Sequence, residues 1–141
     1  MSARPFRILV TGSRDWVDRD TIRSALLTQI NAAVSADDSR WPVLVHGGCP
    51  TGADAIADEV WRDLMTRYTS LDEPEVHAAD WRTEGRAAGP KRNARMVALG
   101  ADVVLAFPIG KSPGTRGCMA LARKAGIPVV NYDPALSEGA A

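Results

Sequence analysis

Short hydrophobic runs alternate along the chain with longer segments in which hydrophobic residues recur every three or four positions. The short runs have the length of buried strands and cover residues 7–11, 43–45, 75–78, 102–107 and 127–130. The longer segments predict helices around residues 22–34, 53–65, 89–99 and 113–125. Five strands alternating with four helices predict an α/β fold: a Rossmann-like, doubly wound parallel sheet with helices on both faces.

Polar residues and prolines at the boundaries of these segments refine the prediction. Asp18 and Asp20 are candidate caps of the first helix. Thr51, followed three residues later by Asp54, has the spacing of a capping box at the start of the second helix. Pro128 cannot donate a hydrogen bond within a sheet, so the last strand is expected at a sheet edge.

Length and composition predict one ordinary globular domain. The chain has 141 residues, of which 45% are hydrophobic and 24% charged. We expect one domain over residues 1–133 and a flexible C-terminal tail over residues 134–141, which are mostly small and polar. The first residues contain no hydrophobic signal segment, and no hydrophobic run approaches the ~20 residues of a membrane span. A cytoplasmic location without a membrane partner is expected.

Charge and cysteine usage disfavour two further classes of protein. Lys plus Arg and Asp plus Glu both number 17, which gives zero net charge. Because binding to duplex nucleic acid depends on neutralising phosphates, this balance makes a nucleic-acid partner unlikely. Cys49 and Cys118 form no CxxC pair, and His46 and His77 add no zinc-ligand spacing. We expect no metal and no other cofactor.

Glycines, hydroxyl groups and basic residues follow the carboxyl ends of the first four predicted strands. In a parallel sheet these ends meet at one edge, where open α/β folds bind their ligands. Glycine lets backbone N–H groups approach an anion, helix N-termini offer free N–H groups, and Lys and Arg add charge. A phosphate-binding site is therefore predicted at this edge. Its expected residues are Gly12, Ser13, Arg14, Gly47, Gly48, Thr51, Gly52, Asp80, Trp81, Lys91, Arg92, Asn93, Gly110, Lys111, Ser112, Gly114 and Thr115.

Several residues at this edge also have an ordinary structural interpretation, because turns after strands favour Gly, Ser, Thr and Asp for local reasons. His46 is either a packed strand end or an acid/base group facing a ligand. Asp54 is either a helix cap or a site carboxylate. Trp16 and Trp81 could each stack a base. The candidate catalytic residues are Arg92, Asp54 and His46.

Three segments of the sequence resemble a known family. They are TGSRD at residues 11–15, HGGCPTGAD at residues 46–54 and AGPKRNARM at residues 88–96. Together they are similar to the SLOG superfamily, and in particular to its YspA/YpsA-type branch, which is common in bacteria and phages. The members are Rossmann-like domains related to the LOG phosphoribohydrolases and to DNA-processing proteins. The resemblance runs from about Ile8 to Val130.

The resemblance implies phosphate binding more strongly than it implies catalysis. LOG enzymes cleave the N-glycosidic bond of nucleoside 5′-monophosphates with an Arg and a Glu. Arg92 matches their Arg, and Gly114 and Thr115 match their Gly-Thr pair. The position of the Glu is taken by Cys118, so the resemblance does not imply LOG activity. The relatives often form dimers, which leaves a homodimer open.

Three functions remain after this comparison. The first is a binding or sensing domain for a nucleotide or a nucleotide-derived, phosphate-containing small molecule. The second is an N-glycosidic or phosphate-ester hydrolase with a substitute carboxylate from Asp54, Asp80 or Glu84, in which Lys91 and Arg92 hold the phosphate. The third is a single-stranded nucleic-acid binder, which would use Trp81 and a local basic cluster. That cluster comprises Arg82, Arg86, Lys91, Arg92 and Arg95.

Overall fold

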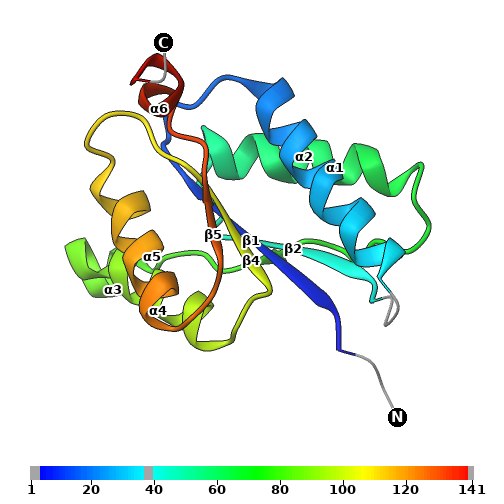
Figure 1. Ribbon diagram of the computed structural model, residues 1–141. Helices are drawn as coiled ribbons and strands as arrows, with labels where there is room; N and C mark the ends of the chain where they lie inside the picture. Colours follow the sequence, from blue (N-terminus) through cyan, green and yellow to red (C-terminus); the bar gives the residue numbers. More distant parts are fainter. Residues whose placement is uncertain (1–3, 37–39, 140–141) are drawn as a thin grey trace.

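The computed structural model describes residues 4–36 and 40–139 and contains one five-stranded sheet (Figure 1). Every strand pairing is parallel, and the strand order is β3-β2-β1-β4-β5. The strands are β1 (Phe6–Gly12), β2 (Pro42–His46), β3 (Glu75–Val76), β4 (Val103–Phe107) and β5 (Val129–Asn131). The predicted Rossmann-like α/β fold is confirmed.

The order of the strands places a switch point beside the central strand. From β1 the chain adds β2 and then β3 on one side, and it returns to add β4 and β5 on the other. Neighbouring crossovers therefore diverge on either side of β1, and such a point is where ligands bind in folds of this class. The prediction from Pro128 is also confirmed, because β5 is an edge strand.

Helices cover both faces of the sheet (Figure 1). They are α1 (Arg19–Ser35), α2 (Ala53–Met65), α3 (Trp81–Glu84), α4 (Ala88–Ala98), α5 (Pro113–Lys124) and α6 (Pro134–Gly139), with a 3-10 turn, η1, at Gly85–Ala87. Helices α1 and α2 pack over one face and α4 and α5 over the other. No helix among the described residues is both long and hydrophobic enough to cross a bilayer.

Alternate residues of the central strand serve the two faces. Ile8 and Val10 belong to the cluster under α1 and α2, and Leu9 belongs to the cluster under α4 and α5. This follows from the two-residue period of a strand. All five residues of β4 and of β2 are buried, which agrees with the continuous hydrophobic runs at residues 103–107 and 43–45 of the sequence.

Some expected boundaries are confirmed and others are not. Asp18 caps α1, and its carboxylate accepts a hydrogen bond from the N–H of Thr21 (3.1 Å). The capping box of Thr51 and Asp54 is wrong. Helix α2 begins one residue later than that motif requires, with Gly52 as its cap and no side-chain cap. Asp54 is thus the second residue of the helix, and its carboxylate is used elsewhere.

Two segments differ from the sequence-based expectation. The residues after β3, expected as a loop, form α3 and η1 and lead directly into α4. Residues 134–139, expected within the tail, form helix α6, and residues 140–141 lie outside the described part of the chain. Both segments are too short to show a helical period, so hydrophobic patterning carries no signal for them.

Candidate functional site

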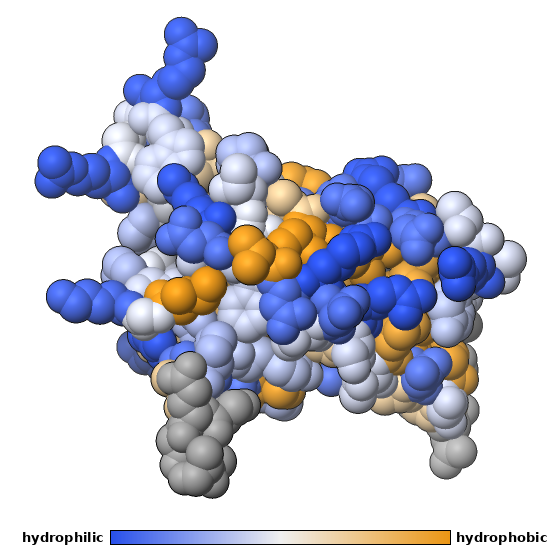
Figure 2. Space-filling model, turned by 90° about the horizontal axis from the view of Figure 1, so that it is seen from above, coloured by the Kyte–Doolittle hydropathy of each residue, from blue (hydrophilic) through white to orange (hydrophobic). Residues whose placement is uncertain are grey.

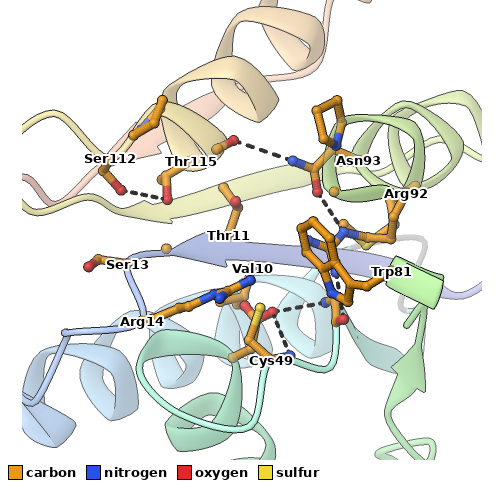
Figure 3. Close-up of a pocket in the computed structure, with 18 residues that line it drawn as sticks. Val10, Thr11, Ser13, Arg14, Cys49, Trp81, Arg92, Asn93, Ser112 and Thr115 are labelled. Carbon is orange, nitrogen blue, oxygen red and sulfur yellow. Dashed lines mark hydrogen bonds between the residues drawn. The ribbon is translucent and has the colours of Figure 1, made fainter. Parts of the chain in front are cut away.

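A pocket of about 350 Å³ lies at the carboxyl edge of the sheet, around the end of β1 (Figure 3). Figure 2, which views the molecule from above relative to Figure 1, shows hydrophilic side chains over most of that face and smaller hydrophobic areas between them. Four chain segments that are distant in sequence contribute to the pocket. The predicted site residues that line it are Gly12, Ser13, Arg14, Gly47, Asp54, Trp81, Arg92, Asn93, Ser112, Gly114 and Thr115.

Arg92 is the buried cation of this pocket. Its side chain comes from α4, and the residue is only 7% exposed. The guanidinium donates to Oδ1 of Asn93 (2.7 Å), to the carbonyl of Gly47 (2.6 Å) and to the carbonyl of His77 (3.4 Å). All three partners are uncharged. The guanidinium therefore satisfies hydrogen bonds in the protein while its charge is left without a counterion among them.

Gly47 makes room for this guanidinium. A Cβ atom built on Gly47 would overlap the terminal nitrogen and the central carbon of the Arg92 side chain. The backbone of Gly47 is not in the left-handed region, so the need for glycine here is one of space and not of backbone angle. The glycine after β2 is thus explained by the close approach of Arg92, 45 residues further along the chain.

Asp54 is the buried anion of the same pocket. Oδ2 of its carboxylate accepts hydrogen bonds from the N–H groups of Gly47 (3.2 Å) and Cys49 (3.4 Å), and the residue is 5% exposed. These bonds fold the loop after β2 around the start of α2. Among the described residues no ion pair joins Asp54 to Arg92, so the pocket wall presents a cation and an anion separately.

The first turn of α5 forms a third part of the wall. Its cap residue, Ser112, has φ of 37° and ψ of 61°. These backbone angles lie in the left-handed region, which residues other than glycine rarely adopt. Ser112 makes no side-chain cap; its hydroxyl donates to Oγ1 of Thr115 (2.9 Å). The N–H groups at the start of α5 consequently lack a side-chain acceptor, which is the arrangement that favours anion binding at a helix N-terminus. Strained backbone of this kind is typical of functional sites.

Neither cysteine has the environment of a nucleophile. Cys49 lines the pocket, but burial and the neighbouring Asp54 carboxylate raise the pKa of its thiol. Cys118 is fully buried below the pocket, and burial raises the pKa of its thiol too. Both thiols are protonated at neutral pH and hence weak nucleophiles.

His46 does not line the pocket. It is 3% exposed, and its Nδ1 accepts a hydrogen bond from the N–H of Gly48 (3.0 Å). The proton is therefore on Nε2, which faces Oδ2 of Asp58 at 2.7 Å. Burial would raise the pKa of Asp58, but hydrogen bonds from Arg62 and His46 outweigh this and lower it. The described contacts make His46 a support for the loop after β2.

Other predicted residues also lie outside the pocket wall, for identifiable reasons. Lys91 points to Glu84 (3.3 Å), which also faces Arg95 (3.9 Å), so these three side chains interact on the exposed side of α4. Asp80 caps α3 by accepting from the N–H of Thr83 (3.2 Å). Gly52 is pressed against the backbone of Ser13 and Arg14. The remaining residues outside the wall are Gly48, Thr51, Gly110 and Lys111, all of them exposed.

The two candidate tryptophans have different environments. Trp16 is 4% exposed, packs edge-to-face on Phe107 with 5.2 Å between ring centroids, and donates from Nε1 to the carbonyl of Asp18. It belongs to the core and offers no free face to a base, so the expectation for Trp16 is corrected. Trp81 is 48% exposed and lines the pocket.

Sequence reasoning missed part of the wall. The missed residues are Val10, Thr11, Cys49, Gly89, Pro90, Met96 and Pro113. Most of them lie inside strands and helices, and several fall within the family-like segments 11–15, 46–54 and 88–96 without having been assigned to the site. Two signals in the sequence could have found Met96: it ends the family-like segment 88–96, and it follows Arg92 by one helical turn on α4.

These features define a Rossmann-like α/β protein with a charged pocket at its switch point. Residues 6–83 match the YspA, cpYpsA-related SLOG family, and the chain belongs to this family. It is also 48% identical over 126 residues to the Gene 61 protein of Mycobacterium phage D29, an alignment that covers 89% of this chain and 95% of the phage protein. No solved structure matches the chain significantly. The family suggests a nucleotide-related ligand and specifies no further function.

Proposed function

We propose that this protein binds a phosphate-containing, nucleotide-type small molecule in the pocket at the carboxyl edge of the sheet. The observation that carries the proposal is the buried Arg92 guanidinium, whose protein partners are all uncharged. Burying a charge is costly unless it is paired, and no described carboxylate lies within ion-pair distance of Arg92, so the site favours an anionic ligand beside this guanidinium. Arginine also grips phosphate with two parallel hydrogen bonds.

Different parts of the pocket wall are suited to different parts of such a ligand. Arg92 and the uncapped first turn of α5 are suited to the phosphate, because both offer N–H donors and positive charge. Asp54 is suited to sugar hydroxyl groups, because a carboxylate accepts hydrogen bonds and repels phosphate. The pocket volume of about 350 Å³ is at the lower end of the range for small-molecule sites, which is roughly 300–1,000 Å³.

The chemistry of the pocket favours binding and sensing over hydrolysis. Cys118 stands where the LOG-like motif has its glutamate, and it is fully covered. A thiol held protonated by burial can neither stabilise a cationic sugar nor activate water as a carboxylate does. His46, the other candidate acid/base, is engaged with Asp58 outside the pocket wall.

One observation supports a second candidate function. Asp54 places a buried carboxylate on the pocket wall, contributed by α2 in place of the missing glutamate on α5. An N-glycosidic hydrolase would use it to stabilise the developing sugar cation. Incubation with the four common nucleoside 5′-monophosphates distinguishes the two functions. Release of free base and ribose 5-phosphate that is abolished in Asp54→Asn would establish the hydrolase, and absence of release with retained binding supports sensing.

Thermal unfolding with a panel of ligands tests the proposed binding. A ligand that binds only the folded protein stabilises it by RT ln(1 + [L]/Kd), or about 2.7 kcal/mol at 100 times Kd. We expect at least one nucleoside phosphate to raise the unfolding temperature of the wild-type protein, and the matching nucleoside without phosphate to raise it much less. Equal stabilisation by nucleoside and nucleotide, or none by any compound, would contradict the proposal.

A further inference from the structure

Trp81 lies at the mouth of the pocket with much of its indole accessible. It is the first residue of α3 and is 48% exposed, although large aromatic side chains are normally covered (Figure 3). The edge of the indole rests on the first turn of α4: a Cβ atom on Gly89 would lie 3.0 Å from its Cη2 atom. The ring is thus held by backbone at its edge without being buried.

A second pocket residue lies over the indole. The guanidinium carbon of Arg14 is 5.6 Å from the centroid of the Trp81 ring, a cation–π distance. Arg14 reaches this position from the turn after β1, and its side chain is exposed. A planar cation therefore occupies the space beside the indole, within the pocket and across from the segment that carries Trp81.

We propose that Trp81 is the aromatic platform on which the base of the ligand stacks, and that the base takes the place held by the Arg14 guanidinium. This inference rests on the proposed function. It assigns a contact to the base, the part of the ligand for which the other wall residues offer no partner. Arg92, Asp54 and the start of α5 account for phosphate and sugar, and Trp81 is the aromatic ring among the residues that line the pocket.

The exchange of Arg14 for a base is physically reasonable. A cation–π contact at an exposed site is among the weaker interactions of a protein. Base stacking on an aromatic side chain is stronger and tolerates any base, because every base has a flat π face. Arg14 lines the pocket, so when displaced it stays close enough to add a positive charge beside an anionic ligand.

The environment of Trp81 also differs from that of the tryptophans that pack in the core. The packing tryptophans of this protein are covered: Trp16 is 4% exposed and Trp61 is fully buried, and each donates from Nε1 to a backbone carbonyl. Trp81 shares neither feature among the described contacts. Its position against Gly89 fixes the orientation of a ring that is otherwise available.

Affinity measurements with matched probes test the platform. Isothermal calorimetry is run with the best-binding of the four nucleoside 5′-monophosphates and with ribose 5-phosphate, which has the same phosphate and sugar without the base. Trp81→Ala is expected to weaken nucleotide binding about tenfold or more and to leave ribose 5-phosphate binding unchanged. Trp81→Phe keeps a flat ring and is expected to restore most of the affinity.

Tryptophan fluorescence supplies an independent readout with a matched control. Trp41 is 37% exposed and directly precedes the amino end of β2, whereas the pocket lies at the carboxyl ends of the strands. Stacking on Trp81 predicts that nucleotide quenches the fluorescence of the wild type and of Trp41→Phe, and that this quenching is lost in Trp81→Phe.

The possible failures are distinguishable. If the wild type binds nucleotide and ribose 5-phosphate equally well and Trp81→Ala changes neither affinity, the platform is wrong and the phosphate site stands. If the wild type binds none of these probes, the proposed function fails and the platform fails with it.

Discussion

The two ends of the sheet surround an arginine side chain in opposite ways. At the amino ends of the strands, Arg7 makes two hydrogen bonds to the carboxylate of Glu75 (2.8 and 2.7 Å), and Arg40 donates to Asp102 (2.7 Å). At the carboxyl ends, Arg92 contacts two carbonyls and an amide and meets no carboxylate among its partners. The side chains at the amino ends form an amino-end network of four residues: Arg7, Arg40, Glu75 and Asp102.

The difference shows what each arginine is available for. In the amino-end network each guanidinium contacts a carboxylate of the protein, and the network ties β1, β3 and the segment before β4 together. In the pocket the protein supplies hydrogen bonds to Arg92 without neutralising it. The amino-end network is therefore expected to determine stability, and Arg92 to determine ligand binding.

Removing the charge of Arg92 should give the largest effect on binding. Arg92→Met keeps a long hydrophobic chain and loses the guanidinium, and we expect nucleotide affinity to fall about 100-fold, because charge-assisted hydrogen bonds to phosphate are lost. Calorimetric titration measures this loss. Arg95→Met, on the exposed side of the same helix, is the matched control and should bind as the wild type does.

Removing Arg7 should affect stability and leave binding intact. Arg7→Met leaves the Gly100 carbonyl without its partner and removes two hydrogen bonds from the Glu75 carboxylate, which keeps its contact with Nε2 of His77 (2.7 Å). This is expected to lower the free energy of unfolding by about 2 kcal/mol. Urea unfolding measures the change. A variant with wild-type stability and weakened nucleotide binding would reverse the assignment of the two regions.

Filling the space beside Arg92 should give a smaller effect. The methyl group in Gly47→Ala would overlap the guanidinium, which is the far end of a flexible side chain and can move aside. We expect the fold to persist and nucleotide affinity to drop about tenfold, since Arg92 is shifted and not removed. Gly117→Ala, on α5 with open space around it, should leave affinity unchanged. Equal affinities in the two variants would argue against a ligand contact by Arg92.

The smallest effect concerns pH. Hydrogen bonds from the Arg7 guanidinium and, to a smaller extent, from His77 outweigh the opposing effect of burial and lower the pKa of Glu75 from 4.5 to about 2. A carboxyl whose pKa is lower in the folded protein stabilises the fold fully above pH 4.5 and loses that contribution as pH falls towards 2. Unfolding temperatures measured from pH 6 to pH 2 should fall less steeply in Glu75→Gln than in the wild type. Superimposable profiles would show that the ion pair contributes nothing.

The order of the elements and the edge that carries the pocket could be predicted from the sequence. Buried parallel strands are continuous hydrophobic runs, as in 103–107, and the helices between them keep a helical period. Once the strands are known to be parallel, their carboxyl ends must meet, so Ser13, Gly47 and Ser112 had to come close together. This much follows from geometry without any knowledge of side-chain packing.

The details of the site depend on packing that the sequence does not express. Trp16 and Trp81 both follow a strand and look equivalent in sequence, but only Trp16 has Phe107 beside it to cover its ring. The spacing of Asp54 from Thr51 left both a helix cap and a site carboxylate open in the sequence, and the start of α2, one residue later than a capping box requires, places the carboxylate in the pocket. Such shifts lie within the uncertainty of any helix boundary.

A crystal structure of the protein with the nucleotide that raises its unfolding temperature most tests the central claim directly. The account predicts that the phosphate lies within hydrogen-bond distance of the Arg92 guanidinium and of the N–H groups in the first turn of α5. A phosphate bound instead to the exposed side of α4, at Lys91 or Arg95, with Arg92 still in contact only with protein carbonyls and Asn93, would contradict it.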